Sequence, residues 1–195
     1  MIKKVILFSA LMCVINAQAV TDTQKKMITT LGSIASIYDS MYAPALWKKE
    51  FSNWTLQAEV SIAREKILAK EISLSEYHKI VNSFILSMKD YHTSVRFFAT
   101  EKATLPFMIR GSQGRFFFVY IDRTKLPKES FPFDLGDELL EMNDIKVSEI
   151  VNKIKSTLGG NADKTDQAIA EMILTARSAS RAHTVPQGPV TLKIK

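Results

Sequence analysis

The chain has 195 residues, of which 46% are hydrophobic, 24% charged and 9% aromatic. This length suits one ordinary domain or two small ones. The composition is globular, which excludes a disordered tail, a collagen-like fibre and a coiled coil. The single cysteine, Cys13, excludes a disulfide framework and any metal site built from several thiolates.

The first nineteen residues have the pattern of a secretory signal peptide. Lys3 and Lys4 precede the apolar run 5–15, and Ala17 and Ala19 supply the small residues of a cleavage site. The apolar run is shorter than the roughly 20 residues that a membrane-spanning helix needs. We therefore expect an exported protein, periplasmic or secreted, with no stable membrane span after cleavage.

Cleavage after Ala19 would leave 176 residues without any cysteine, a composition that suits an oxidising compartment. Loss of the two leader lysines lowers the net charge from +6 to +4. The sequence contains no cluster of five or more basic residues, so the positive charge is spread along the chain. The charge is that of a soluble surface, and we expect no nucleic-acid partner.

The stretch 20–100 is predicted to be helical. Apolar residues recur at steps of three and four over 23–42, again after Trp54, and again after Ser73 and Glu76, which form a capping box. The predicted buried stripes are Met27, Leu31, Ile34, Tyr38 and Met41; Leu56, Val60, Ala63 and Ile67; and Tyr77, Ile80, Val81, Phe84 and Met88. An aromatic cluster between the first two helices is expected to fill the core rather than stack on a ligand. Its members are Trp47, Phe51 and Trp54.

The stretch 101–195 is predicted to be rich in strands. Residues 107–110 and 115–121 flank the turn 111–114 and predict a hairpin. Further strands are expected at 94–99, 138–142 and 190–194, with one helix capped by Ser148 and running to about Thr157. A second helix is expected to bury Ile169, Met172, Ile173 and Ala176. The fold class is therefore α+β, an N-terminal amphipathic helical region followed by a small β-rich domain.

The sequence contains none of the common motifs for a nucleophile elbow, a zinc protease or a phosphate-binding loop. The three histidines are far apart in the sequence, and none has a second ligand at the spacing of a metal site. We expect no metal and no cofactor. His78 is expected on the flank of its helix, and His183 is expected to make a structural hydrogen bond.

His92 differs because it falls where a predicted helix ends and a predicted strand begins. Catalytic residues are common at such junctions, where rigid elements fix the side chain and a loop leaves it open. An imidazole can accept and return a proton near neutral pH. From position alone, a structural hydrogen bond is the default and a catalytic role the alternative. Asp90 can either orient the ring or end the helix.

The segment around His92 resembles the Asp-x-His-Thr segment of the tricorn and carboxyl-terminal-processing serine proteases. Within that group, the likeness is closest to the secreted enzymes of the chlamydial protease-like activity factor (CPAF) type. It spans roughly residues 38–195 as an ordered series. The matching stretches are Tyr42-Ala43-Pro44 with Trp47-Lys48 and Trp54; Tyr91-His92-x-x-Val95-x-Phe97-Phe98-Ala99; Leu105-Pro106; Gly114-Arg115-Phe116-x-Phe118-Val119; Gly136-Asp137-Glu138-Leu139-Leu140-Glu141; His183-x-Val185-Pro186-x-Gly188; and Thr191-Leu192-Lys193-Ile194.

The resemblance implies three segments: a signal peptide over 1–19, a helical region over 20–100 ending in the His92 segment, and a PDZ-like domain over 101–195. It also implies that His92 is the general base of an exported serine endopeptidase. In that family the nucleophilic serine, its acidic partner and the oxyanion-hole amides come from a later domain. No serine here matches the nucleophile motif, so we expect this polypeptide alone to be inactive as a peptidase.

Three interpretations remain open at this point. The chain is the N-terminal part of a secreted protease, or a stand-alone exported PDZ-like peptide-binding module, or a protein that complements or inhibits a full-length relative. The expected partners are a polypeptide substrate or extended peptide, and a C-terminal protease domain or full-length homologue.

Overall fold

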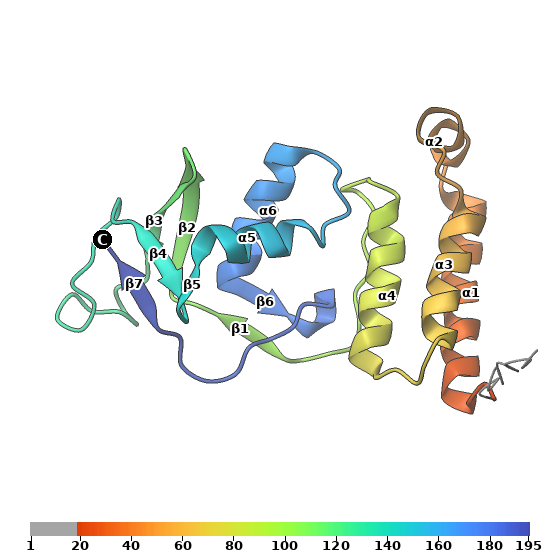
Figure 1. Ribbon diagram of the computed structural model, residues 1–195, viewed down its shortest axis with the longest axis horizontal. Coiled ribbons are helices and arrows are strands. Elements are labelled where there is room, and N and C mark those ends of the chain that lie inside the picture. Colours follow the sequence, from red (N-terminus) through yellow and green to blue (C-terminus); the bar gives the residue numbers. More distant parts are fainter. Residues whose placement is uncertain (1–18) are drawn as a thin grey trace, which may run out of the picture.

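The computed structural model describes residues 19–195, so the predicted signal peptide lies outside the described residues except for Ala19. Figure 1 shows helices gathered at the N-terminal side of the molecule, and strands with further helices at the other side. Each side has its own apolar core. The predicted α+β class is confirmed.

The N-terminal side consists of α1 (Asp22–Met41), α2 (Ala45–Ser52), α3 (Leu56–Leu68) and α4 (Leu74–Ser87). Capping boxes begin α1 and α4, each with a hydroxyl that accepts from a backbone N–H one turn later. The predicted box of Ser73 and Glu76 is thereby confirmed. The amide of Gln24 donates to the carbonyl oxygens of Ile67 (2.8 Å) and Lys70 (3.2 Å), so α1 caps the end of α3.

The core of this side contains most of the predicted stripes. Its buried residues come from α1, α3, α4 and the segments flanking α3 and α4: Met27, Leu31, Trp54, Leu56, Ala63, Ile67, Ile72, Tyr77, Val81, Phe84, Ile85 and Met88. Three predictions were wrong, because Met41 (77% exposed), Trp47 (56%) and Phe51 (70%) lie on the surface. The eight-residue α2 contributes no buried residue to this core, and over residues 19–195 its aromatic side chains lie on the surface.

The C-terminal side is built on a hairpin and a three-stranded sheet. The hairpin joins β2 (Phe107–Ser112) and β3 (Arg115–Ile121) through Gln113 and Gly114. Both turn residues have positive φ, 51° and 77°, as a two-residue hairpin turn requires. The sheet has the order β5-β4-β7, with β4 (Leu139–Met142) between β5 (Ile145–Lys146) and β7 (Leu192–Ile194).

Helices α5 (Val147–Lys155) and α6 (Asp163–Thr175) complete this second core. Helix α5 begins without a side-chain cap, so the predicted Ser148 cap was wrong. The predicted face of α6 was partly wrong. Met172 is 51% exposed, and Ala176 is exposed and lies beyond the end of the helix, whereas Ala170, Glu171 and Leu174 are buried. After α6, the short β6 (Ala176–Ser178) pairs with β1 (Lys102–Thr104) and leads into a 3-10 turn, Ala179–Arg181.

The predicted strand over 94–99 is also wrong. This segment links the two sides, and no strand of the described part of the chain pairs with it. One backbone hydrogen bond, from the Phe97 N–H to the Ser180 carbonyl at 2.9 Å, attaches it to the second side. Its side chains alternate between partly buried and exposed, which is the pattern that suggested a strand.

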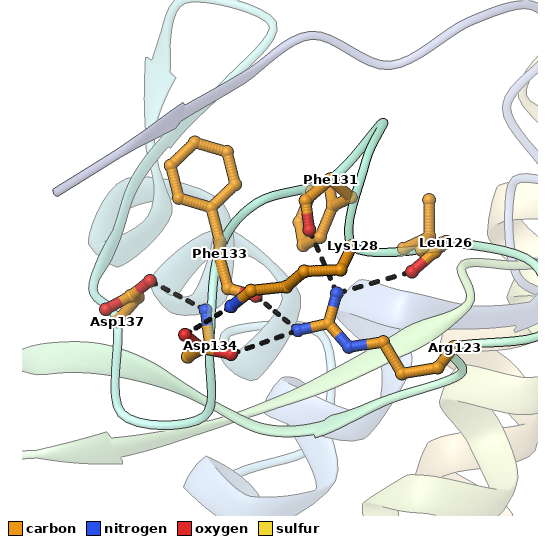
Figure 2. Close-up of polar contacts among 7 residues, drawn as sticks. All are labelled: Arg123, Leu126, Lys128, Phe131, Phe133, Asp134 and Asp137. Carbon is orange, nitrogen blue, oxygen red and sulfur yellow. Dashed lines mark hydrogen bonds and ion pairs between the residues drawn. The ribbon is translucent and has the colours of Figure 1, made fainter.

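Arg123 holds together the long loop between β3 and β4 (Figure 2). Its guanidinium donates to the carbonyl oxygens of Leu126 (3.3 Å) and Phe131 (2.9 Å), and also to that of Phe133. Asp134 lies 3.4 Å from the same group, so the loop folds around one fixed cation. This clamp places Phe131 on the second core, where its ring meets those of the hairpin.

Candidate active site around His92

His92 lies in a tight turn immediately after α4. The helix ends with Met88 as its C-cap, and Lys89 adopts a left-handed conformation with φ of 48°. The Asp90 carbonyl then accepts from the Thr93 N–H (3.1 Å) and the Thr93 hydroxyl (2.8 Å). These bonds hold the main chain around His92 while its side chain is 98% exposed.

Asp90 orients the His92 ring. Its Oδ1 accepts from the His92 backbone N–H at 2.9 Å and lies 3.1 Å from the ring Nδ1. A proton on Nδ1 is therefore donated to the carboxylate, which leaves Nε2 free to accept a proton from solvent or substrate. The two roles suggested for Asp90 are combined, since it both closes the turn and orients the ring.

Tyr42, which joins α1 to α2, completes this arrangement. Its hydroxyl donates to Asp90 Oδ2 at 3.2 Å. Burial, and then the Asp90 carboxylate, raise the pKa of Tyr42 to about 12, so the hydroxyl keeps its proton. The hydrogen bond from the His92 backbone N–H holds the pKa of Asp90 below its usual value. Asp90 is thus ionised near neutral pH and presents a carboxylate to the ring.

Tyr91 fastens the His92 turn to the second side of the molecule. Its hydroxyl donates to Asp166 Oδ1 at 2.8 Å and accepts from the Ala162 N–H at 2.9 Å. The other carboxylate oxygen of Asp166 accepts from the Asn161 N–H at 2.9 Å. Asp166 is only 2% exposed and lies in the first turn of α6. Asp90 therefore orients His92 in the turn after α4, and Tyr91 ties the same turn to α6.

A close backbone contact supports the same junction. Gly159, in the loop between α5 and α6, has a φ of 82°, and a Cβ placed there would lie 2.7 Å from the Leu86 carbonyl oxygen. Only glycine fits this approach without a shift of α4. Sequence reasoning did not identify Tyr91, Asp166 or Gly159 as linked, because they are far apart in the chain.

The other two histidines, His78 and His183, contact residues other than His92. His78 stacks on Phe97 with ring centroids 4.0 Å apart, so it helps to cover the linking segment. His183 Nδ1 accepts from the Ser178 N–H at 3.3 Å, and burial is the main cause of its lowered pKa. The structural hydrogen bond predicted for His183 is confirmed. Over residues 19–195, no three His, Cys, Asp or Glu side chains gather as a metal site would require.

The outer edge of β2 is a second candidate site. Within the described residues, β2 pairs only with β3, and α6 packs alongside it. A cavity of about 320 Å³ lies between the turn end of the hairpin and helices α5 and α6. Its lining includes Gly111, Phe116, Asn152, Gln167 and Glu171. An extended peptide can add to such an edge as a further strand.

Comparison with known proteins agrees with this architecture. Residues 101–195 match the PDZ domain family. A protein of Chlamydia trachomatis serovar D is 33% identical over 176 residues, which cover 88% of this chain and 28% of the relative. A protein of Chlamydia muridarum is 34% identical over 161 residues, covering 79% of this chain and 25% of the relative.

The crystal structure of mature CPAF superposes with a TM-score of 0.76 at 31% identity, covering 90% of this chain and 32% of that chain. The chain is similar to the N-terminal part of CPAF. The resemblance predicted from the sequence is confirmed, and residues 101–195 form a PDZ domain after a helical region. The chain spans between a quarter and a third of the length of these relatives and of the CPAF structure. None of the helices over 19–195 has the length and apolar character needed to cross a bilayer.

Proposed function

We propose that this chain supplies the general-base histidine and a peptide-binding PDZ domain of an exported CPAF-type serine endopeptidase. The observation that supports the histidine role is the geometry of one turn. Asp90 holds Nδ1 of His92, and Nε2 faces solvent in a fixed position between the helical region and the PDZ domain. A general base in serine peptidases is oriented by a carboxylate in the same way.

We further propose that the chain does not cleave peptides alone. Among the described residues, Asp90 is the side chain that is hydrogen-bonded to His92, and no serine hydroxyl is bonded to the ring. A histidine without a nucleophile or an oxyanion hole cannot stabilise the tetrahedral intermediate of acyl transfer. The full-length CPAF-type relatives, of which this chain covers about a quarter to a third, are the source of those groups in this proposal.

The experiment is a chimaera in which this chain replaces the matched segment of the Chlamydia trachomatis relative. We expect the chimaera to cleave a quenched fluorescent peptide and this chain by itself to leave it intact. The His92→Ala chimaera should be folded and inactive, whereas His183→Ala should keep its activity. Cleavage by the His92→Ala chimaera would show that the histidine assignment is wrong.

The second candidate function is peptide binding without catalysis, and the unpaired edge of β2 favours it. In this proposal an extended peptide pairs with β2 beside α6, as PDZ domains bind their ligands. Saturable binding of extended peptides to the chain, measured by fluorescence anisotropy, would support it. Flat titrations across varied peptides would exclude it.

Export is proposed from the leader sequence. The positive Lys3 and Lys4, the apolar run and the Ala17-Gln18-Ala19 site favour cleavage after Ala19. Expression with the leader in a bacterium should yield an exported product whose first residue is Val20. A cytoplasmic product that retains Met1 would contradict this proposal.

A further inference from the structure

Glu171 occupies an unusual position for a carboxylate. It projects from α6 into the space beside β2, and the residue is only 4% exposed. Its Oε1 accepts from the Gln167 amide at 2.9 Å. The nearest cation to Oε2 is the Arg110 guanidinium, 3.9 Å away, which is beyond hydrogen-bond distance. A charge placed this deeply costs stability unless it is fully paired.

The cavity at the hairpin end of β2 leaves room next to this carboxylate. No buried side-chain polar atom over residues 19–195 lacks a hydrogen-bond partner, so the unbonded Oε2 is open to the cavity rather than sealed in the core. Glu171 and Gly111 both line the 320 Å³ space. The cavity therefore offers a negatively charged wall to whatever enters it.

The register of the hairpin shows where a peptide would meet this wall. Ser112 pairs with Arg115 across a two-residue turn, which makes them a hydrogen-bonded pair. Pairs alternate along an antiparallel ladder, so the N–H and C=O of Gly111 point away from β3. They are free to bond an added strand at the outer edge.

The same register determines the face of the hairpin on which the side chain of the peptide residue opposite Gly111 would lie. Residues opposite one another on paired strands project to the same face. A Cβ built on Gly111 would lie 2.6 Å from Glu171 Oε1, so that face is the one Glu171 covers. Cβ atoms of opposite residues are about 5 Å apart, within the reach of a long side chain to the carboxylate. The absence of a side chain at Gly111 gives the Glu171 carboxylate the room to lie over this strand.

We propose that Glu171 selects a lysine or arginine side chain at the position of the bound peptide that pairs with Gly111. The cation would enter the cavity and donate a hydrogen bond to Oε2, which Arg110 is too far away to donate. This inference rests on the proposed addition of a peptide strand to β2. It names the ligand class as extended peptides with a basic residue at that one position.

The test measures binding of labelled extended peptides to the full chain by fluorescence anisotropy. The peptides form a set of matched triplets with lysine, norleucine or glutamate at one scanned position. At the position opposite Gly111, lysine should bind about tenfold more tightly than norleucine, the scale of a hydrogen bond to a charged group. Glutamate should bind most weakly, and the preference for lysine should fall at high salt.

Two variants identify the carboxylate. Glu171→Gln keeps the size of the side chain and should remove the preference, so that the lysine and norleucine peptides bind with equal affinity. Glu171→Asp keeps the negative charge but moves it about one bond length away from the cavity, and should weaken the preference for lysine. Glu149→Gln, at an exposed position of α5, makes the same change of charge elsewhere and should have no effect. Melting curves establish that each variant is folded.

The outcomes separate this inference from the proposal beneath it. Binding without a preference for lysine, or a preference that survives in folded Glu171→Gln, overturns the role of Glu171 and leaves peptide binding intact. Failure of every peptide to bind overturns peptide addition at β2, and the role of Glu171 with it.

Discussion

Removal of the Tyr91 hydroxyl tests whether the His92 turn is fastened to the PDZ domain. The Tyr91→Phe variant loses the bond to the Asp166 carboxylate at 2.8 Å and the bond from the Ala162 N–H at 2.9 Å. The ring itself remains. Since Asp166 is 2% exposed, one oxygen of a buried carboxylate is left without its hydroxyl donor.

The magnitude follows from these contacts. A hydrogen bond to a charged group contributes about 1.5–3 kcal/mol. Tyr91 is 45% exposed, so water can replace part of what is lost, and we expect the lower end, about 1.5–2 kcal/mol. At 1.4 kcal/mol per factor of ten, local opening of the turn should become roughly ten- to thirtyfold more frequent.

Amide hydrogen exchange measures this opening directly. Backbone amides over 88–95 and 160–166 should exchange faster in Tyr91→Phe by that factor, while amides in the core of α3 should not change. Tyr120→Phe is the matched control, because Tyr120 is similarly exposed at 51% and lies in β3. Equal exchange in the two variants would show that the Tyr91–Asp166 contact does not hold the turn.

Three further predictions concern stability. A backbone hydrogen bond from Ser73 is the main reason that the pKa of Glu76 is lowered to about 2 from 4.5, so its ionised form stabilises the fold above pH 4.5. This contribution is lost as the pH falls from 4.5 to about 2, and Glu76→Gln should flatten the melting temperature over that range; an unchanged profile would contradict it. Arg123→Lys cannot reach the same carbonyls and should cost about 1–3 kcal/mol, with faster proteolysis within 126–134; equal cleavage rates would exclude the clamp. Gly159→Ala should destabilise the fold by about 1–3 kcal/mol in urea titrations, whereas Gly32→Ala, in an open position of α1, should stabilise it by about 0.5–1 kcal/mol; equal effects would contradict the close contact.

Local signals predicted the elements that depend on local contacts. The hairpin turn at Gln113 and Gly114 and the capping box at Ser73 and Glu76 are set by neighbouring residues, and both are present. The ordered series of motifs also predicted the PDZ domain, now matched over residues 101–195. His92 was placed correctly at the end of a helix, with Asp90 close to it.

The errors arise where tertiary partners decide the outcome. Hydrophobic periodicity predicted that Met172 is buried, because this method assigns carboxylates to the surface. In the structure, Asp166 and Glu171 lie on the buried face of α6. Asp166 is buried because Tyr91, far away in the sequence, donates to it. Trp47 is exposed because α2 projects away from the core, which no local pattern reveals.

The rate of serine acylation tests the central proposal most directly. In the chimaera with the Chlamydia trachomatis relative, a fluorophosphonate probe should label the nucleophilic serine, and His92→Ala should slow labelling by about a thousandfold or more. The His183→Ala chimaera should be labelled at the original rate. A His92→Ala chimaera that is folded and labelled as fast as its parent would show that His92 is not the general base.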